Sequence, residues 1–127
     1  MTSTTWLARI ITLGTVALAL GLLGIAGHAT LLPADAATVY GVPTSGRGLT
    51  WVQASGLRDA VLGLVVLGTL WHEAARTMVL GCALLLPLAD TILAFQHGGL
   101  GATLPHAAGV VGIGALLALA VIQTRNR

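Results

Sequence analysis

Four long apolar stretches constrain this sequence more than any other feature. A helix that crosses the hydrocarbon core of a bilayer needs about 20 mostly apolar residues, and we place such helices at about 8–27, 51–71, 75–95 and 104–123. Charged residues make up 8% of the chain, whereas soluble domains carry roughly 25%. The sequence therefore predicts an all-α fold, a four-transmembrane-helix bundle that forms one integral membrane domain over residues 1–127.

The arginines predict how the bundle is oriented. Basic residues gather in cytoplasmic loops of membrane proteins. Arg9, Arg76, Arg125 and Arg127 fall on the side of the termini, against Arg47 on the other side. We expect a multi-pass protein of the bacterial inner membrane with both termini in the cytoplasm. An alternative is that the first stretch and residues 34–36 form a secretory signal with its cleavage site, although the stretch is long for that role.

A long first loop, residues 28–50, is expected on the extracytoplasmic side. Pro33, Gly41, Pro43 and Gly46 punctuate turns and disfavour regular structure. We expect this loop to fold over the outer end of the bundle and to bring Tyr40 towards the polar residues of the second span. The third connection, residues 96–101, is predicted to be a glycine-rich turn.

Four ionisable residues interrupt the predicted spans. Arg58 and Asp59 lie in the second, Asp90 in the third, and His106 near the start of the fourth. Such residues cost about 2.5 kcal/mol or more at the centre of a bilayer, so they are usually paired or line a wet cavity. At 1.5 Å of rise per residue, all four fall in the outer half of the membrane, and the inner half holds no comparable charge. Their common depth predicts one polar site between the helices.

The polar site has a functional and an architectural interpretation. Asp59 and Asp90 are candidate catalytic proton acceptors, and His106 is the candidate donor because histidine titrates near neutrality. Arg58 is a candidate ligand-binding residue for a carboxylate or oxyanion, and Tyr40 is one for a hydrogen bond. In the architectural alternative, Arg58 pairs with Asp90, or with Asp59 of its own helix, and only fixes the packing.

Other kinds of site find little support. His97 is a candidate ligand-binding residue or a solvated loop histidine, and its spacing from His106 and Asp90 does not fix a metal geometry. We expect no metal and no cofactor. Cys82 is the only cysteine, which excludes a disulfide framework. A net charge of +2 without a basic run gives no nucleic-acid surface.

Several short motifs resemble a family of small uncharacterised four-helix integral membrane proteins. The resemblance covers roughly residues 6–123 and implies the four-helix architecture, but it supplies no activity. It is most specific at the Arg-Asp pair that follows Ala-x-Gly in the second span. The matching residues are Tyr40-Gly41-Val42-Pro43, Ala54-Ser55-Gly56-Leu57-Arg58-Asp59, Asp90, His97-Gly98-Gly99 and His106 followed by Gly109.

Three functions fit these observations. The first is an intramembrane site for a lipophilic small molecule, with acid–base chemistry of the isomerase or cyclase type. The second is a structural or accessory subunit, whose glycine-rich faces pack on another copy of the chain or on another membrane protein. The third is a small proton-coupled transporter, against which the outer-half position of the site argues. The expected partners are therefore the lipid bilayer, a lipophilic molecule and other membrane helices, without nucleic acid.

Overall fold

The computed structural model describes residues 3–126, apart from the side chains of residues 3, 4, 97 and 98. Four helical elements follow one another: α1 (Ser3–Leu31), α2 (Pro33–Tyr40), α3 (Arg47–Gly68) and α4 (Glu73–Arg125). The element α4 contains two helices that meet at Gly99, and we treat them as a first half, Glu73–Gln96, and a second half, Gly99–Arg125. Residues 3–126 thus form five helical segments.

The four-helix bundle predicted from the sequence is wrong. Besides the additional segment α2, only three helices within residues 3–126 are long and apolar enough to cross a membrane, namely residues Thr5–Leu31 of α1 and the two halves of α4. The element α3 has 22 residues, which is sufficient length. It carries Arg47, Arg58 and Asp59, and these charges make it less apolar than the other three.

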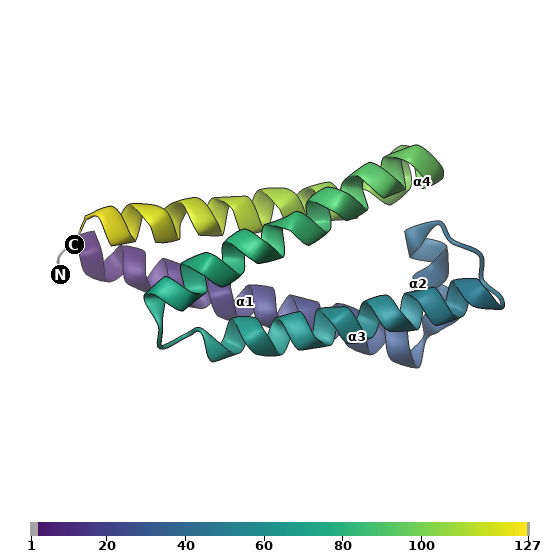
Figure 1. The fold of residues 1–127 in the computed structure, drawn as a ribbon, viewed down its shortest axis with the longest axis horizontal. Helices are drawn as coiled ribbons and strands as arrows, with labels where there is room; N and C mark the ends of the chain where they lie inside the picture. Colours follow the sequence, from purple (N-terminus) through teal and green to yellow (C-terminus); the bar gives the residue numbers. More distant parts are fainter. Residues whose placement is uncertain (1–2, 127) are drawn as a thin grey trace.

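The long helices run back and forth between the two ends of the molecule (Figure 1). The first turn of α1 and the last turn of α4 lie at one end, which we call the terminal end. The short helix α2 lies at the opposite end, which we call the α2 end (Figure 1). Because α1 packs most extensively against α3, these two helices form one layer and the two halves of α4 form a second.

Two glycines let α3 approach α1 closely. A Cβ atom on Gly56 would lie 2.8 Å from the Cβ of Ala29, and one on Gly63 would lie 3.1 Å from the carbonyl oxygen of Ala19. Residues three or four apart on a helix share a face, so Asp59 lies on this same face between the two glycines. Close packing against α1 therefore buries Asp59 and fixes the rotation of α3 about its axis.

Two apolar clusters hold the layers together at opposite ends. The one at the terminal end joins α1 to both halves of α4, and the one at the α2 end joins α1, α2 and α3. The first consists of Ile11, Leu80, Ile113, Leu116 and Ala120, and the second of Ala29, Ala36, Ala37 and Val52.

The first connection is more regular than predicted. The helix α1 continues to Leu31, and α2 then begins with Pro33 at its first turn and ends at Gly41, which has φ 67°. Proline fits the first turn of a helix because its missing N–H is not needed there, and glycine adopts the left-handed conformation that ends a helix. The expectation of an irregular loop over 28–50 is therefore wrong, because these two residues bound a short helix.

The connection at residues 96–101 also differs from the expected glycine-rich turn. Helical backbone continues on both sides of Gly99, where φ is 71° and ψ is −170°. That conformation is essentially restricted to glycine. The second half of α4 consequently starts before the predicted residue 104, and His106 lies about two turns inside it rather than in its first turn.

Polar side chains also meet at the terminal end, where the sequence indicated no comparable charge. The amide nitrogen of Gln123 donates a hydrogen bond of 3.2 Å to the carboxylate of Glu73, and this bond ties the two halves of α4 together. Arg76 follows one turn after Glu73 and is only 3% exposed. The expectation that the termini-side half holds no comparable buried charge is therefore wrong.

Candidate functional site

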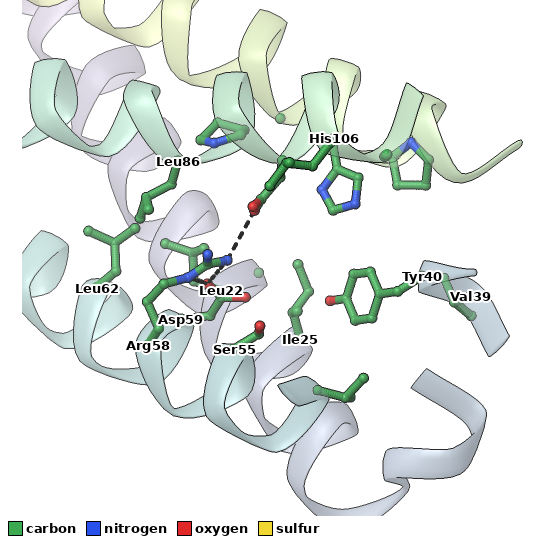
Figure 2. A pocket seen from close by; sticks show the side chains of 18 of the residues that line it. Leu22, Ile25, Val39, Tyr40, Ser55, Arg58, Asp59, Leu62, Leu86 and His106 are labelled. Carbon is green, nitrogen blue, oxygen red and sulfur yellow. Dashed lines mark hydrogen bonds and ion pairs between the residues drawn. The ribbon is translucent and has the colours of Figure 1, made fainter. Parts of the chain in front are cut away.

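A cavity of about 590 Å³ lies at the α2 end, between the two helical layers. All five helical segments contribute to its wall, which is mostly apolar. Figure 2 shows Leu22, Ile25, Leu62 and Leu86 around it. The cavity exists because α3 makes few contacts with α4, while α2 covers the end of the gap.

Arg58 binds two carboxylates at the edge of this cavity. Its Nη2 atom donates a hydrogen bond of 3.1 Å to Oδ2 of Asp90, and its Nε atom donates one of 3.1 Å to Oδ1 of Asp59. The same Nη2 atom lies 3.0 Å from Oδ1 of Asp59. We call Arg58, Asp59 and Asp90 the charged triad (Figure 2). The alternatives that the sequence left open, pairing with Asp90 or with Asp59, are both realised.

The rotation of α3 explains how one arginine reaches two acids. Successive residues on a helix point about 100° apart. Asp59 lies on the glycine face against α1, with its side chain 10% exposed, whereas Arg58 points across the gap towards α4 with its side chain 38% exposed. Asp90, on the first half of α4, is 25% exposed. The triad therefore connects α3 to α4 where little else does.

A proline lies inside the helix about one turn before Asp90. Pro87 lies inside α4, where it lacks the N–H that a helix interior normally uses. The hydroxyl of Thr91 donates a hydrogen bond to the carbonyl oxygen of Pro87. A Cβ atom on Gly109 would lie 3.3 Å from the Cβ of Pro87, so the two halves of α4 pack closely beside the site.

Tyr40 and His106 form the far side of the cavity. Their rings stack with centroids 5.7 Å apart and an interplanar angle of 23°, and Figure 2 shows the Tyr40 side chain extending from α2 into the site. Tyr40 also packs against the apolar cluster at the α2 end. Burial, and then the negative charge of Asp59, raise the pKa of Tyr40. Its hydroxyl therefore stays protonated and can donate a hydrogen bond.

The structure gathers most of the predicted site residues around one space. Five of them line the cavity: Tyr40, Arg58, Asp59, Asp90 and His106. The side chain of His97 lies outside the described residues. In the part of the chain that the structure describes, no three His, Cys, Asp or Glu side chains are grouped so that they could hold a metal ion.

Three further polar or aromatic residues line the cavity without having been predicted. They are His28, Trp51 and Ser55. Their position at the outer end of the predicted helices was a usable signal, because His28 ends the first apolar stretch and Trp51 begins the second. Ser55 precedes Arg58 by three residues, which places both on one side of α3.

The fold and site together define a class of protein. The described part of the chain contains three helices of membrane-spanning length and apolarity, which make this a small multi-pass membrane protein. Residues 14–121 match the model of the family described as a domain of unknown function, DUF4267. The chain belongs to the DUF4267 family, which agrees with the resemblance to an uncharacterised family, while the individual motifs of that resemblance stay predictions. Neither a curated protein nor a solved structure gives a significant match.

Proposed function

We propose that the cavity at the α2 end binds a lipophilic small molecule, with the polar group of that molecule beside the charged triad. The observation that carries this proposal is a space of about 590 Å³ with a mostly apolar wall and a group of charges at one edge. Binding sites for small molecules have volumes of about 300–1,000 Å³, apolar walls and a few convergent polar groups.

The hydrogen-bonding capacity of the triad supports this proposal. In the described part of the chain, Nη1 of Arg58 donates no hydrogen bond. Oδ2 of Asp59 and Oδ1 of Asp90 accept none from these residues either. Polar groups in an apolar setting are costly when they lack partners. A bound molecule with a polar group supplies such partners.

Acid–base chemistry on the bound molecule is the second part of the proposal. Asp59 and Asp90 are the proton acceptors, and His106 is the donor. The protonated hydroxyl of Tyr40 holds a polar atom of the substrate. A positioned carboxylate and imidazole on one cavity suffice for an isomerase or cyclase type of reaction.

The architectural alternative also has a specific observation in its favour. The charged triad joins α3 to the first half of α4, and these elements otherwise touch little. In that account the triad stabilises the packing, and the cavity is occupied by lipid or water without preference. The two accounts differ in whether the protein retains a defined molecule.

We extend the proposal to the orientation of the chain. The terminal end holds the first turn of α1 and the last turn of α4 (Figure 1). Arg9 and Arg76 belong to the N-terminal parts of α1 and α4, and Arg125 ends α4. Basic residues gather on the cytoplasmic side of membrane proteins. We therefore place both termini in the cytoplasm and the cavity towards the opposite face of the membrane.

Native mass spectrometry of the protein in mild detergent tests the binding proposal. Ala94 lines the cavity, so Ala94→Trp should fill part of it, whereas Ala89 is exposed on the same helix and Ala89→Trp is the matched control. We expect the parent protein and Ala89→Trp to carry one additional defined mass, and Ala94→Trp to lose it. A defined mass retained equally by all three proteins would contradict binding in this cavity.

A further inference from the structure

We infer that the molecule bound by the cavity is a lipophilic cation, such as a protonated amine, and that its binding displaces a proton from the site. This inference rests on the proposed function and narrows its ligand to one chemical class. It follows from the charges on the cavity wall and from what already occupies Arg58.

The titratable groups of the wall come from every element around the cavity. With both histidines neutral and the tyrosine protonated, the wall holds one positive and two negative charges. The cavity therefore carries an excess negative charge near pH 8. The groups concerned are His28 on α1, Tyr40 on α2, Arg58 and Asp59 on α3, and Asp90 and His106 on α4.

An excess charge in an apolar cavity requires compensation. A buried charge that is not paired is so unfavourable that the group tends to take up a proton instead. A proton on Asp59, the more buried of the two carboxylates, provides that compensation when the cavity holds no ligand. An organic cation provides it equally well, and its hydrocarbon part is buried against the apolar wall. Binding of a cation and binding of a proton therefore exclude one another.

An anionic ligand is disfavoured by the same geometry. From the sequence, Arg58 was expected to hold a carboxylate or oxyanion of the ligand. In the structure its guanidinium already binds Asp59 and Asp90. An anion would bring a third negative charge to one arginine, and like charges at such distances repel. Arg58 therefore serves to position the two carboxylates.

Aromatic rings around the cavity fit a cation as well. Tyr40 and Trp51 both line it, and Tyr40 is fixed by its stacking on His106. The faces of tyrosine and tryptophan rings attract cations, and the attraction increases when water is excluded. The carboxylates and these rings lie around the same space, so one cation can contact both.

Three rigid probes of similar shape test the charge preference. Tetraphenylphosphonium is a lipophilic cation, tetraphenylborate is its anionic counterpart, and triphenylphosphine oxide is neutral. Isothermal titration in maltoside micelles measures their binding, with Ala94→Trp as the reference for partition into the micelle. Near pH 8 we expect the cation to bind about tenfold more tightly than the neutral probe, which corresponds to about 1.4 kcal/mol. The anion should not bind above the reference.

Acidification should weaken binding of the cation alone. One displaced proton changes the affinity by up to about tenfold per pH unit below the titration of the site. Asp90→Asn leaves one acid on one arginine, so this variant should lose both the cation preference and the pH dependence while it still binds the neutral probe. Asp35 is exposed on α2 and is absent from the cavity wall, so Asp35→Asn should behave as the parent does. If Asp90→Asn does not fold, Asp59→Asn makes the same change of charge.

The possible failures are distinguishable. If the parent binds cation and neutral probe equally, and both are lost in Ala94→Trp, the cation inference is wrong and the binding proposal stands. If no probe binds the parent more tightly than Ala94→Trp, the proposed function itself is contradicted.

Discussion

Arg58 binds two carboxylates. Because one positive charge faces two negative charges, removal of the arginine and removal of an acid have different effects on the charged triad. Removing the arginine leaves two partly buried acids without a counter-charge. Removing one acid leaves an arginine and a carboxylate that balance each other. The architectural role of the triad can therefore be separated from its excess charge by single substitutions.

We expect Arg58→Met to be far more destabilising than Asp90→Asn. Loss of one member of a buried pair costs about 3–5 kcal/mol, and the partial exposure of Arg58 places its loss at the lower end, about 3 kcal/mol. Asp90→Asn should change the free energy of unfolding by less than about 1 kcal/mol. Thermal unfolding followed by tryptophan fluorescence measures both. Equal losses in the two variants would mean that the triad carries no excess negative charge.

Tyr40 is the only tyrosine in the chain, so its titration can be observed directly. Burial and the charge of Asp59 raise the pKa of Tyr40 above its ordinary value of 10.0. Tyrosinate absorbance should therefore appear at a higher pH than in an unstructured peptide. Asp59→Asn should lower the midpoint without returning it to the ordinary value, because burial remains. A midpoint at or below 10.0 in the parent would show that Tyr40 does not lie in the cavity.

Among the elements, α3 depends on its glycines for its position. A Cβ atom would lie 2.8 Å from the nearest atom of α1 at Gly56 and 3.1 Å at Gly63, whereas one on Gly68 would meet nothing within 4 Å. We expect Gly56→Ala to destabilise the protein by about 1–3 kcal/mol through overpacking. Gly68→Ala, the matched control, should be neutral or stabilising, because alanine favours the helix by up to about 1 kcal/mol. Unfolding monitored by circular dichroism compares them, and equal effects would contradict the close α1–α3 contact.

Sequence patterns predicted the presence of the helices better than they predicted where the helices end. Long apolar stretches predict helices well, because in a membrane each helix satisfies its own backbone hydrogen bonds. Their ends were predicted poorly at Pro33 and Gly41, which disrupt a long helix but also bound a short one. Gly99 was interpreted as part of a loop, whereas a single residue of unusual conformation joins two helices there.

Depth along the helices predicted part of the site. Arg58 and Asp90 were expected to be at one level because the rise per residue of a helix is fixed, and they form a hydrogen bond. Which residues surround a cavity depends on helix rotation, and that is set by close contacts such as Gly63 against Ala19. Such contacts leave no periodic signal in one sequence, so His28 and Trp51 could have been found only from their position at the ends of the predicted spans.

At the scale of the whole molecule, the cavity results from an uneven distribution of packing. Apolar clusters close the bundle at the terminal end and fix α2 at the other end, while the space between α3 and α4 stays open beside the charged triad. The helices that form the cavity wall are also apolar on their lipid-facing surfaces. A ligand that enters from the bilayer would therefore contact apolar side chains both before and after it enters the cavity. What distinguishes the cavity from the lipid-facing surface is its polar edge.

Photo-crosslinking with an alkylamine that carries a diazirine tests the central claim, binding in this cavity, most directly. The modified residues are identified by peptide mass spectrometry, with and without an excess of the same amine lacking the diazirine. The account predicts labelling of wall residues on several elements, such as Val39, Leu62 and Leu93, and its suppression by the competitor. Labelling that the competitor leaves unchanged, spread over exposed residues away from the cavity such as Leu13, Leu64 and Met78, would contradict a binding site there.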